Sequence, residues 1–315
     1  MSFVNELRND DGIKERKLAD GISSFNFTSK TFKKKNWNSR TVKARGLFID
    51  VNSDEIVARS YDKFFAIGER PETQMEALEE NLQYPVKGYV KENGFLGIVS
   101  GREDGTLFVA SKSTNEGDFA ELFGTILDSY FVFDRGRKEQ LAYWLYEHNL
   151  SLVFEVIDPI RDPHIVKYSH NHLVLLDIIE NTIDFHPMPI NCVRELANKL
   201  EIPYKVPVFE ANSFEEVKYY LGYWENKVGV EGLVLCDANN FMFKMKTKWY
   251  KFWKHVRTIA QQLACKPAES VKGYMELSET DPAFAVFLCD YISLHGYTSV
   301  ISIRDDWEAE LEAED

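Results

Sequence analysis

One lysine at the end of an alternating apolar run constrains this chain more than any other feature. The run over 89–91 ends on Lys91, a polar turn covers 92–94, and a second apolar run follows over 95–100. This pattern predicts a strand, a tight turn and a second strand that together form a hairpin. A lysine amine held by strands can act as a nucleophile when burial or a neighbouring cation lowers its pKa. Ordinary hairpin turns use the same residues, so the chemical interpretation needs support from the rest of the chain.

Strand patterns and helix patterns alternate until about residue 247, and helix patterns follow. We expect further strands over 46–51, 55–60, 106–111, 152–158, 173–179, 231–236 and 241–246. Helices are predicted over 71–83, 118–131, 137–148, 191–200 and 213–227. Residues 1–30 are expected to form a helical and loop lead-in. The chain is therefore predicted to contain a mixed domain over 1–248 and a helical module with an acidic tail over 249–315.

The composition is that of a globular chain. Of the 315 residues, 44% are hydrophobic, which is enough for a sizeable core and too much for a disordered chain. No apolar run approaches the roughly 20 residues that a membrane span needs, and residues 1–10 lack the apolar core of a signal peptide. The four cysteines are widely spaced, which argues against a zinc site or a disulfide framework. We expect a cytoplasmic protein without a membrane partner.

The net charge of -13 argues at first against a nucleic-acid partner. However, the tail over 305–315 carries seven acids and no base, so it supplies more than half of that charge. Two windows without an acid, 33–45 and 244–257, each carry six basic residues. Such runs can be solvated faces, but the second window alternates lysines with aromatic residues, a mixture that suits phosphate and base contacts.

Charged residues interrupt apolar strands at four places: Lys91, Glu155, Glu231 and the pair Lys244 and Lys246. A buried charge is costly unless it is paired or used. The pair is separated by two residues, so both side chains leave one strand face. Carboxylates could hold a ribose hydroxyl or a hydrated magnesium ion, and lysines could hold a phosphate. Taken singly, the glutamates could instead be edge or capping residues.

In this order, the motifs resemble those of the covalent nucleotidyltransferases. The chain looks most like RNA ligases of the phage RNA ligase 1 type and the adenylyltransferase domain of fungal tRNA ligases. The matching motifs are Lys91-Glu92-Asn93-Gly94, Phe154-Glu155, Glu231-Gly232 and Lys244-Met245-Lys246, with upstream markers at Arg45-Gly46 and Lys63-Phe64-Phe65. The resemblance covers about residues 40–254. It implies an α+β nucleotidyltransferase domain (ATP-grasp-like ligase), with antiparallel sheets around an ATP cleft, plus a small helical C-terminal module.

The resemblance also implies roles for individual residues. Lys91 would be the nucleophile that carries AMP, assisted by Lys244 and Lys246, which with magnesium would lower its pKa. Glu155 and Glu231 would hold Mg²⁺ or Mn²⁺ through water. The residues expected to bind ATP are Arg45, Lys63, Phe65, Val90, Asn93, Gly94, Lys112, Glu155, Glu231, Lys244, Lys246 and Tyr250. Phe65 and Tyr250 would support the pocket walls.

The implied reaction joins an RNA 3′-hydroxyl to a 5′-phosphate through a lysyl-AMP and an adenylylated RNA, in RNA repair or tRNA splicing. A cleaved tRNA is the expected partner. The chain has no Gly-x-x-x-x-Gly-Lys-Ser/Thr loop, so an end-healing kinase or phosphatase would have to come from elsewhere.

Two departures from the family pattern leave alternatives open. Asn93 stands where many members have aspartate, and the C-terminal region does not obviously align with the helical domain of the phage enzyme. A DNA ligase or a GTP-using capping enzyme shares the core motifs but carries a C-terminal OB barrel, which the helical pattern disfavours. A non-catalytic module that binds RNA ends and keeps a nucleotide pocket is the alternative from another class.

Overall fold

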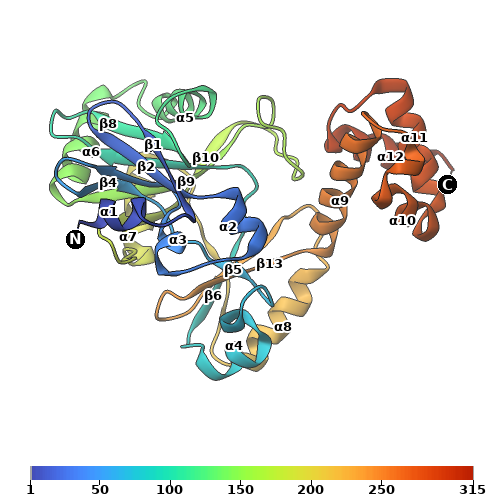
Figure 1. Cartoon of the computed structure of the whole chain (residues 1–315), viewed down its shortest axis with the longest axis horizontal. Coiled ribbons are helices and arrows are strands. Elements are labelled where there is room, and N and C mark those ends of the chain that lie inside the picture. Colours follow the sequence, from blue (N-terminus) through green and yellow to red (C-terminus); the bar gives the residue numbers. More distant parts are fainter. Residues whose placement is uncertain (1, 315) are drawn as a thin grey trace.

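The computed structural model describes residues 2–314 and contains three β-sheets and a helical C-terminal part (Figure 1). The first sheet is an antiparallel meander in the order β1-β2-β3-β4. Its strands are β1 (Ile13–Lys17), β2 (Ile22–Phe27), β3 (Leu47–Asp50) and β4 (Glu55–Arg59). Three short helices accompany it, α1 (Phe3–Arg8), α2 (Ser29–Lys34) and α3 (Ser39–Lys43).

The expectation of a helical and loop lead-in over 1–30 is wrong for most of that segment, because β1 and β2 form a hairpin there. Strand β1 carries four charged residues among its five and shows no apolar alternation. Strand β2 is buried but contains Ser23, Ser24 and Asn26, which no hydrophobic pattern marks. These polar groups are satisfied by tertiary hydrogen bonds, for example from Ser24 Oγ to the main-chain oxygen of Ser113 at 2.7 Å.

The second sheet has the order β10-β9-β7-β8, and its neighbouring strands are all antiparallel. Its strands are β7 (Phe95–Gly101), β8 (Leu107–Ser111), β9 (Leu150–Ile157) and β10 (His172–Glu180). One face packs on α5 (Asp118–Ser129), α6 (Arg135–Glu147) and α7 (Ile190–Leu200), with Phe123 and Phe154 in the shared core. The other face meets the first sheet, where the rings of Phe48 and Phe108 lie 5.2 Å apart. The predicted strands and helices of this region are confirmed.

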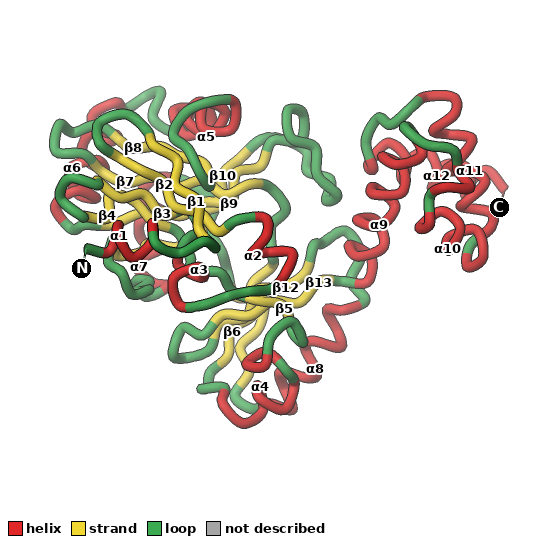
Figure 2. The backbone as a smooth tube through the Cα atoms, in the orientation of Figure 1, coloured by secondary structure: helices red, strands yellow, loops and turns green. Residues whose placement is uncertain are grey.

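The third sheet has the order β11-β6-β12-β13-β5 and lies below the first two in Figure 2. Its strands are β5 (Phe65–Ala66), β6 (Val86–Val90), β11 (Pro207–Ala211), β12 (Gly232–Cys236) and β13 (Met242–Lys246). It packs on α4 (Met75–Asn81), which follows the 3-10 helix η1 (Pro71–Thr73), and on α8 (Phe214–Glu225). Among the paired strands of residues 2–314, β13 and β5 are the one parallel pair, and the other neighbours in this sheet are antiparallel.

The predicted lysine hairpin is wrong, because β6 belongs to the third sheet and β7 to the second. The segment 91–94 therefore links two sheets. Gly94 makes this crossing possible: a Cβ atom on it would lie 2.1 Å from the main-chain oxygen of Val156 in β9. Local alternation and turn residues are the same for a hairpin and for such a link, so only the pairing partners of the strands distinguish them.

Helices form the rest of the chain. They are α9 (Lys248–Leu263), the 3-10 helix η2 (Ala268–Ser270), α10 (Lys272–Thr280), α11 (Pro282–His295) and α12 (Val300–Glu314). Thr247 caps α9 by accepting a hydrogen bond from the main-chain nitrogen of Tyr250 at 3.0 Å. The helices share a core around Trp253 and Phe284, and Figure 1 shows α10 to α12 beyond the far end of α9. Within residues 2–314 we find no helix with the length and apolarity of a membrane span.

We predict that Gly94→Ala destabilises the protein by about 1–3 kcal/mol, the usual cost of forcing extra volume into a packed site. The new methyl group would overlap a main-chain oxygen that β9 holds in place. Urea unfolding followed by circular dichroism measures the effect. Gly124→Ala is the matched control, because Gly124 lies within α5 with open space around its Cβ position, and it should gain about 0.5–1 kcal/mol. Equal stability of both variants would contradict the crowding at Gly94.

Candidate active site

Neighbouring strands bring Lys91 beside a buried carboxylate. Strands β6, β12 and β13 lie side by side, with Lys91 just after β6, Glu231 just before β12 and Lys246 at the end of β13. Lys91 Nζ lies 3.1 Å from Glu231 Oε2, and Lys246 Nζ lies 2.8 Å from Glu231 Oε1. Glu231 is only 3% exposed, so its charge depends on these two ammonium groups.

Asn93 completes the surroundings of Glu231. Its Nδ2 atom donates to Glu231 Oε2 at 2.8 Å, and its Oδ1 atom accepts from the main-chain nitrogens of Ile165 and Val166, each at 3.1 Å. The side chain therefore donates on one side and accepts on the other, which an ionised aspartate could not do. The amide at this position, which departs from many family members, matches its hydrogen-bond partners in this chain.

Glu155 approaches Lys91 from the second sheet. It lies in β9, and its Oε1 atom accepts a hydrogen bond from the main-chain nitrogen of Gly94 at 2.9 Å. Burial raises the pKa of Glu155, although the nearby Lys91 opposes that effect. Burial also acts to raise the pKa of Glu231, but Lys91 and Lys246 outweigh it, so the pKa is lowered. The two carboxylates thus come to Lys91 from different sheets.

We expected Lys244 and Lys246, together with magnesium, to lower the pKa of Lys91, and the two lysines by themselves do not do so. Burial acts to lower the pKa of Lys91, but Glu231 and Glu155 favour its charged form, and the net effect raises the pKa. Lys91 is therefore an ammonium group in an ion pair in this state. The sequence pattern identified the nearby cations, but it could not show that Glu231 pairs directly with Lys91 at 3.1 Å or that Glu155 acts in the same direction.

The lysine with a strongly lowered pKa is Lys244. Burial lowers its pKa to about 7, and the cations Lys63, Lys91 and Arg45 act in the same direction. Burial likewise lowers the pKa of Lys63 to about 8, with Glu69 opposing it at 4.0 Å. Within residues 2–314, Lys244 forms no ion pair, and its Nζ lies 5.1 Å from the centre of the Phe64 ring. These crowded cations would be stabilised by an anion among them.

These cations and Lys91 line one cavity between the second and third sheets. Six of the residues predicted from the sequence line this cavity. Five of them are charged, namely Arg45, Lys63, Lys91, Glu155 and Lys244, and the sixth is Val90. The remaining walls are largely apolar or aromatic, and sequence reasoning did not identify them: Tyr61, Phe64, Tyr89, Leu96, Leu176, Val234, Cys236 and Met242. Leu176 lies at a β-bulge in β10, where the register with β9 shifts. A cavity with apolar walls and clustered cations suits a nucleotide, whose base is flat and whose phosphates are anionic.

A buried polar group lies at another part of this cavity wall. The Tyr61 hydroxyl donates to Asp177 Oδ2 at 2.6 Å, and the ammonium of Lys205 contacts the same oxygen. Burial raises the pKa of Tyr61 well above its usual range, and the negative charge of Asp177 adds to that effect. The three residues come from distant parts of the sequence, so no local motif marks them.

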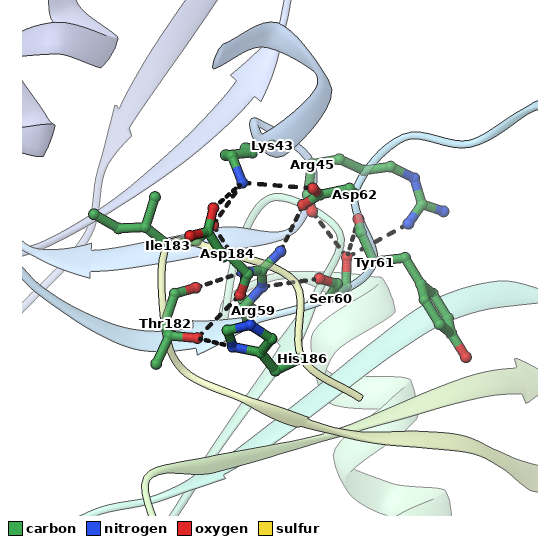
Figure 3. Close-up of polar contacts among 10 residues, drawn as sticks. All are labelled: Lys43, Arg45, Arg59, Ser60, Tyr61, Asp62, Thr182, Ile183, Asp184 and His186. Carbon is green, nitrogen blue, oxygen red and sulfur yellow. Dashed lines mark hydrogen bonds and ion pairs between the residues drawn. The ribbon is translucent and has the colours of Figure 1, made fainter. Parts of the chain in front are cut away.

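A buried arginine holds the turn that carries Arg45. Arg59 donates from Nη1 to the main-chain oxygens of residues 182–184 and from Nη2 to Asp62 at 2.5 Å (Figure 3). Next to it, the Ser60 hydroxyl donates to the main-chain oxygen of Arg45 at 2.8 Å. The end of β4 is thereby fixed to the loop after β10. The Arg45 guanidinium extends to the Tyr61 side of this network, where its Nη1 atom donates to Ser60 Oγ at 3.4 Å (Figure 3). Arg45 also lines the cavity.

Seven predicted residues lie outside the cavity lining: Phe65, Asn93, Gly94, Lys112, Glu231, Lys246 and Tyr250. Phe65 lies behind the lining, and its ring centre is 3.8 Å from Lys63 Nζ. Tyr250 lies on the Glu231 side, where its hydroxyl accepts from Asn93 Nδ2 at 3.3 Å and its ring lies 4.5 Å from Lys246 Nζ. Lys112 lies over the Phe27 ring at 4.7 Å and lines a different surface cavity. Phe65 and Tyr250 thus contact cations of the site without lining the cavity.

The residues present fit a divalent cation held mainly by water and phosphate. No group of three or more His, Cys, Asp or Glu side chains gathers as a metal site within residues 2–314. Glu155 and Glu231 both lie near Lys91, and each still has acceptor capacity. Mg²⁺ usually keeps several waters and binds through one or two carboxylates together with substrate phosphates. Two glutamates beside a cationic cavity meet that description.

The comparisons with known proteins point in one direction. The family described as RNA ligase matches residues 43–250. The tRNA ligase of Candida albicans is 29% identical over 272 residues, which cover 73% of this chain and 33% of that protein. The tRNA ligase 1 of Schizosaccharomyces pombe is 28% identical over 309 residues, which cover 84% of this chain and 38% of that protein. The chain thus spans little more than a third of the length of these fungal relatives.

Solved structures support the fold. A putative ATP-dependent DNA ligase from Aquifex aeolicus has a TM-score of 0.56 at 16% identity, covering 93% of this chain and 80% of its own. An archaeal ATP-dependent RNA ligase has a TM-score of 0.53 at 14% identity, covering 96% of this chain and 72% of its own. The predicted α+β ligase fold with antiparallel sheets is confirmed.

The lowered pKa of Lys244 leads to a pH-dependent prediction. With divalent cations chelated, affinity for ATP should fall at least about tenfold between about pH 7.5 and about pH 9.5, because Lys244 must regain a proton to hold phosphate. The charge on ATP itself changes little in this range, since the second phosphate ionisation lies near pH 6. Isothermal titration calorimetry across the range measures the slope.

Lys244→Arg is the matched control for this slope. Arginine keeps its charge over the whole range, so the variant should bind ATP with a clearly weaker dependence on pH. The pH dependence of ATP affinity that remains in this variant is assigned to Lys63, whose pKa is about 8. Equal slopes for the wild type and Lys244→Arg would show that Lys244 does not carry the effect.

Proposed function

The chain belongs to the RNA ligase family, and on this premise we propose that it is an ATP-dependent ligase that joins RNA ends. Its substrates are a 3′-hydroxyl end and a 5′-phosphate end, and its product is a phosphodiester bond. One observation carries the proposal: the amine of Lys91 lines a cavity that also holds Arg45, Lys63 and Lys244. A nucleophile beside clustered cations is what attack on a triphosphate requires.

In the first step, the Lys91 amine attacks the α-phosphorus of ATP. A P–N bond forms, and the P–O bond to pyrophosphate breaks. Lys91 must first lose the proton that it holds against Glu231. Glu155 and Glu231 would hold Mg²⁺ or Mn²⁺ through water, and the ion would supply positive charge that favours the neutral Lys91 amine. Lys63 and Lys244 offset the charge on the departing pyrophosphate.

In the second step, an oxygen of the RNA 5′-phosphate attacks the phosphorus bound to Lys91. The P–N bond breaks, the lysine takes up a proton, and AMP is joined to the RNA through a pyrophosphate linkage. In the third step, the 3′-hydroxyl of the other end attacks the original 5′-phosphorus and loses its proton, and AMP leaves. We assign Lys244 and Lys246 to the stabilisation of charge on the phosphate oxygens in these steps.

We assign residues 1–248 to the adenylyltransferase domain and 249–315 to a helical module. The part described after residue 247 contains helices and no strand, which favours an RNA ligase over DNA ligases and capping enzymes with an OB barrel. The two fungal relatives are named tRNA ligases, which supports a cleaved tRNA, in repair or splicing, as the substrate. An end-healing kinase or phosphatase is the partner that such ends would require.

A non-catalytic module that binds RNA ends is the second candidate. The specific contacts of Lys91 with Glu231 and of Lys246 with the same carboxylate favour catalysis, because binding alone would not need this buried ion cluster. The two candidates differ in whether a covalent AMP forms on the protein.

The decisive experiment is incubation with Mg²⁺ and α-labelled ATP or GTP, followed by denaturing electrophoresis and mass spectrometry. We expect an AMP adduct on Lys91 with ATP, no adduct with GTP, and complete loss of label in Lys91→Ala. The control is Lys87→Ala, because Lys87 lies in β6, which ends just before Lys91, but pairs with Glu210 at 3.8 Å and does not line the nucleotide cavity. Absence of any adduct from folded wild-type protein would favour the binding module. RNA and DNA ends can then be compared as substrates for joining.

A further inference from the structure

A second cavity lies on the surface beside α2, and its lining joins cations with aromatic rings. We propose that this α2 cavity, formed by Lys14, Phe27, Phe32, Lys33, Lys112 and Ser113, binds the 5′-phosphorylated end of a single-stranded RNA. The terminal phosphate lies among the lysines, and the first base stacks on Phe32. The inference rests on the proposed function, and it names the subsite that presents the RNA end to Lys91.

The charges of the α2 cavity are of one sign. Its three lysines come from separate elements: Lys14 from β1, Lys33 from α2 and Lys112 from the segment after β8. No Asp or Glu is part of the described lining. Burial lowers the pKa of Lys112, and the nearby charges of Arg45 and Lys14 act in the same direction. Three ammonium groups without a carboxylate suit a doubly charged terminal phosphate better than a neutral 3′-hydroxyl end.

The aromatic residues of the cavity are placed for stacking. Phe32 lies in α2 and is 54% exposed, and its ring is nearly parallel to that of Phe27, with the centres 6.3 Å apart. Exposed aromatic rings beside cations are the elements with which proteins bind single-stranded nucleic acid. Such stacking needs no particular base, so the cavity would accept RNA ends of different sequence.

The α2 cavity is connected to the nucleotide cavity through packed rings. Trp37 lies 4.8 Å from Phe27 and 5.3 Å from Phe65, measured between ring centres. Phe65 in turn supports Lys63, which lines the nucleotide cavity. Figure 1 shows α2 between the first two sheets and the edge of the third sheet at β5. An RNA end bound beside α2 would therefore lie next to the phosphate-binding side of the active site.

The test measures RNA binding apart from chemistry. Fluorescence anisotropy with a short 3′-blocked RNA compares a 5′-phosphate end with a 5′-hydroxyl end at fixed salt. We expect Phe32→Ala to weaken binding of both RNAs about 5- to 100-fold, and Phe32→Trp to restore it. The double variant Lys14→Gln and Lys33→Gln should abolish the preference for the 5′-phosphate. Phe133→Ala is the control. Phe133 is also a fully exposed phenylalanine, but it is distant in sequence from the residues of this cavity and does not line it.

Joining assays separate this inference from the proposed function. If it is correct, Phe32→Ala lowers the ratio of RNA joining to Lys91 adenylylation, and Phe133→Ala leaves that ratio unchanged. The α2 cavity is overturned as an RNA site if Phe32→Ala and the lysine double variant both bind and join RNA at wild-type levels. A further outcome is that the wild-type protein forms no AMP adduct, while these variants bind RNA more weakly than the wild type does. In that case the proposed ligase activity fails and the RNA site stands.

Discussion

The buried carboxylate of Glu231 is the group on which the arrangement of the site depends. It binds the ammonium groups of Lys91 and Lys246 and the amide of Asn93, so three strands and one inter-sheet link meet at a single charge. An unpaired carboxylate at this depth would be strongly destabilising, and each partner therefore keeps the others in place. The same pairing holds Lys91 charged, so the proposed activation of this lysine as a nucleophile would have to begin with a change in this cluster.

Asn93 extends this cluster to the C-terminal helices. Its Oδ1 atom holds the main chain at 165–166, and the side chains there pack in the same core as Trp253 and Phe284. Arg304 from α12 donates to the main-chain oxygen of Ile165 at 2.9 Å. The C-terminal helices are therefore connected to the segment that follows Lys91 through hydrogen bonds and packing, away from the cavity that Lys91 lines.

The site shows that net charge is a poor guide to local potential. The chain carries a formal charge of -13, yet Arg45, Lys63 and Lys244 gather at one cavity. Burial lowers the pKa of both lysines, and the charge of Arg45 acts in the same direction on each of them. The low-dielectric surroundings strengthen the repulsion between these cations. An anion bound among these cations would relieve that repulsion, so the cavity favours an anion although the chain as a whole is acidic.

The sequence by itself determined the charged groups of the candidate site, since each of them lies in or directly beside an apolar strand, and strands of this kind form locally. These groups are Lys91, Glu155, Glu231, Lys244 and Lys246. The sequence also determined the helical C-terminal region and most strand positions. Only the tertiary structure decided that β6 and β7 enter different sheets, that the polar segment 13–27 forms a hairpin, and that Leu96, Leu176 and Val234 line a cavity. The physical reason is that pairing partners and exposed cavity walls depend on which faces pack together across the whole chain, whereas alternation and turn residues report only on neighbours in sequence.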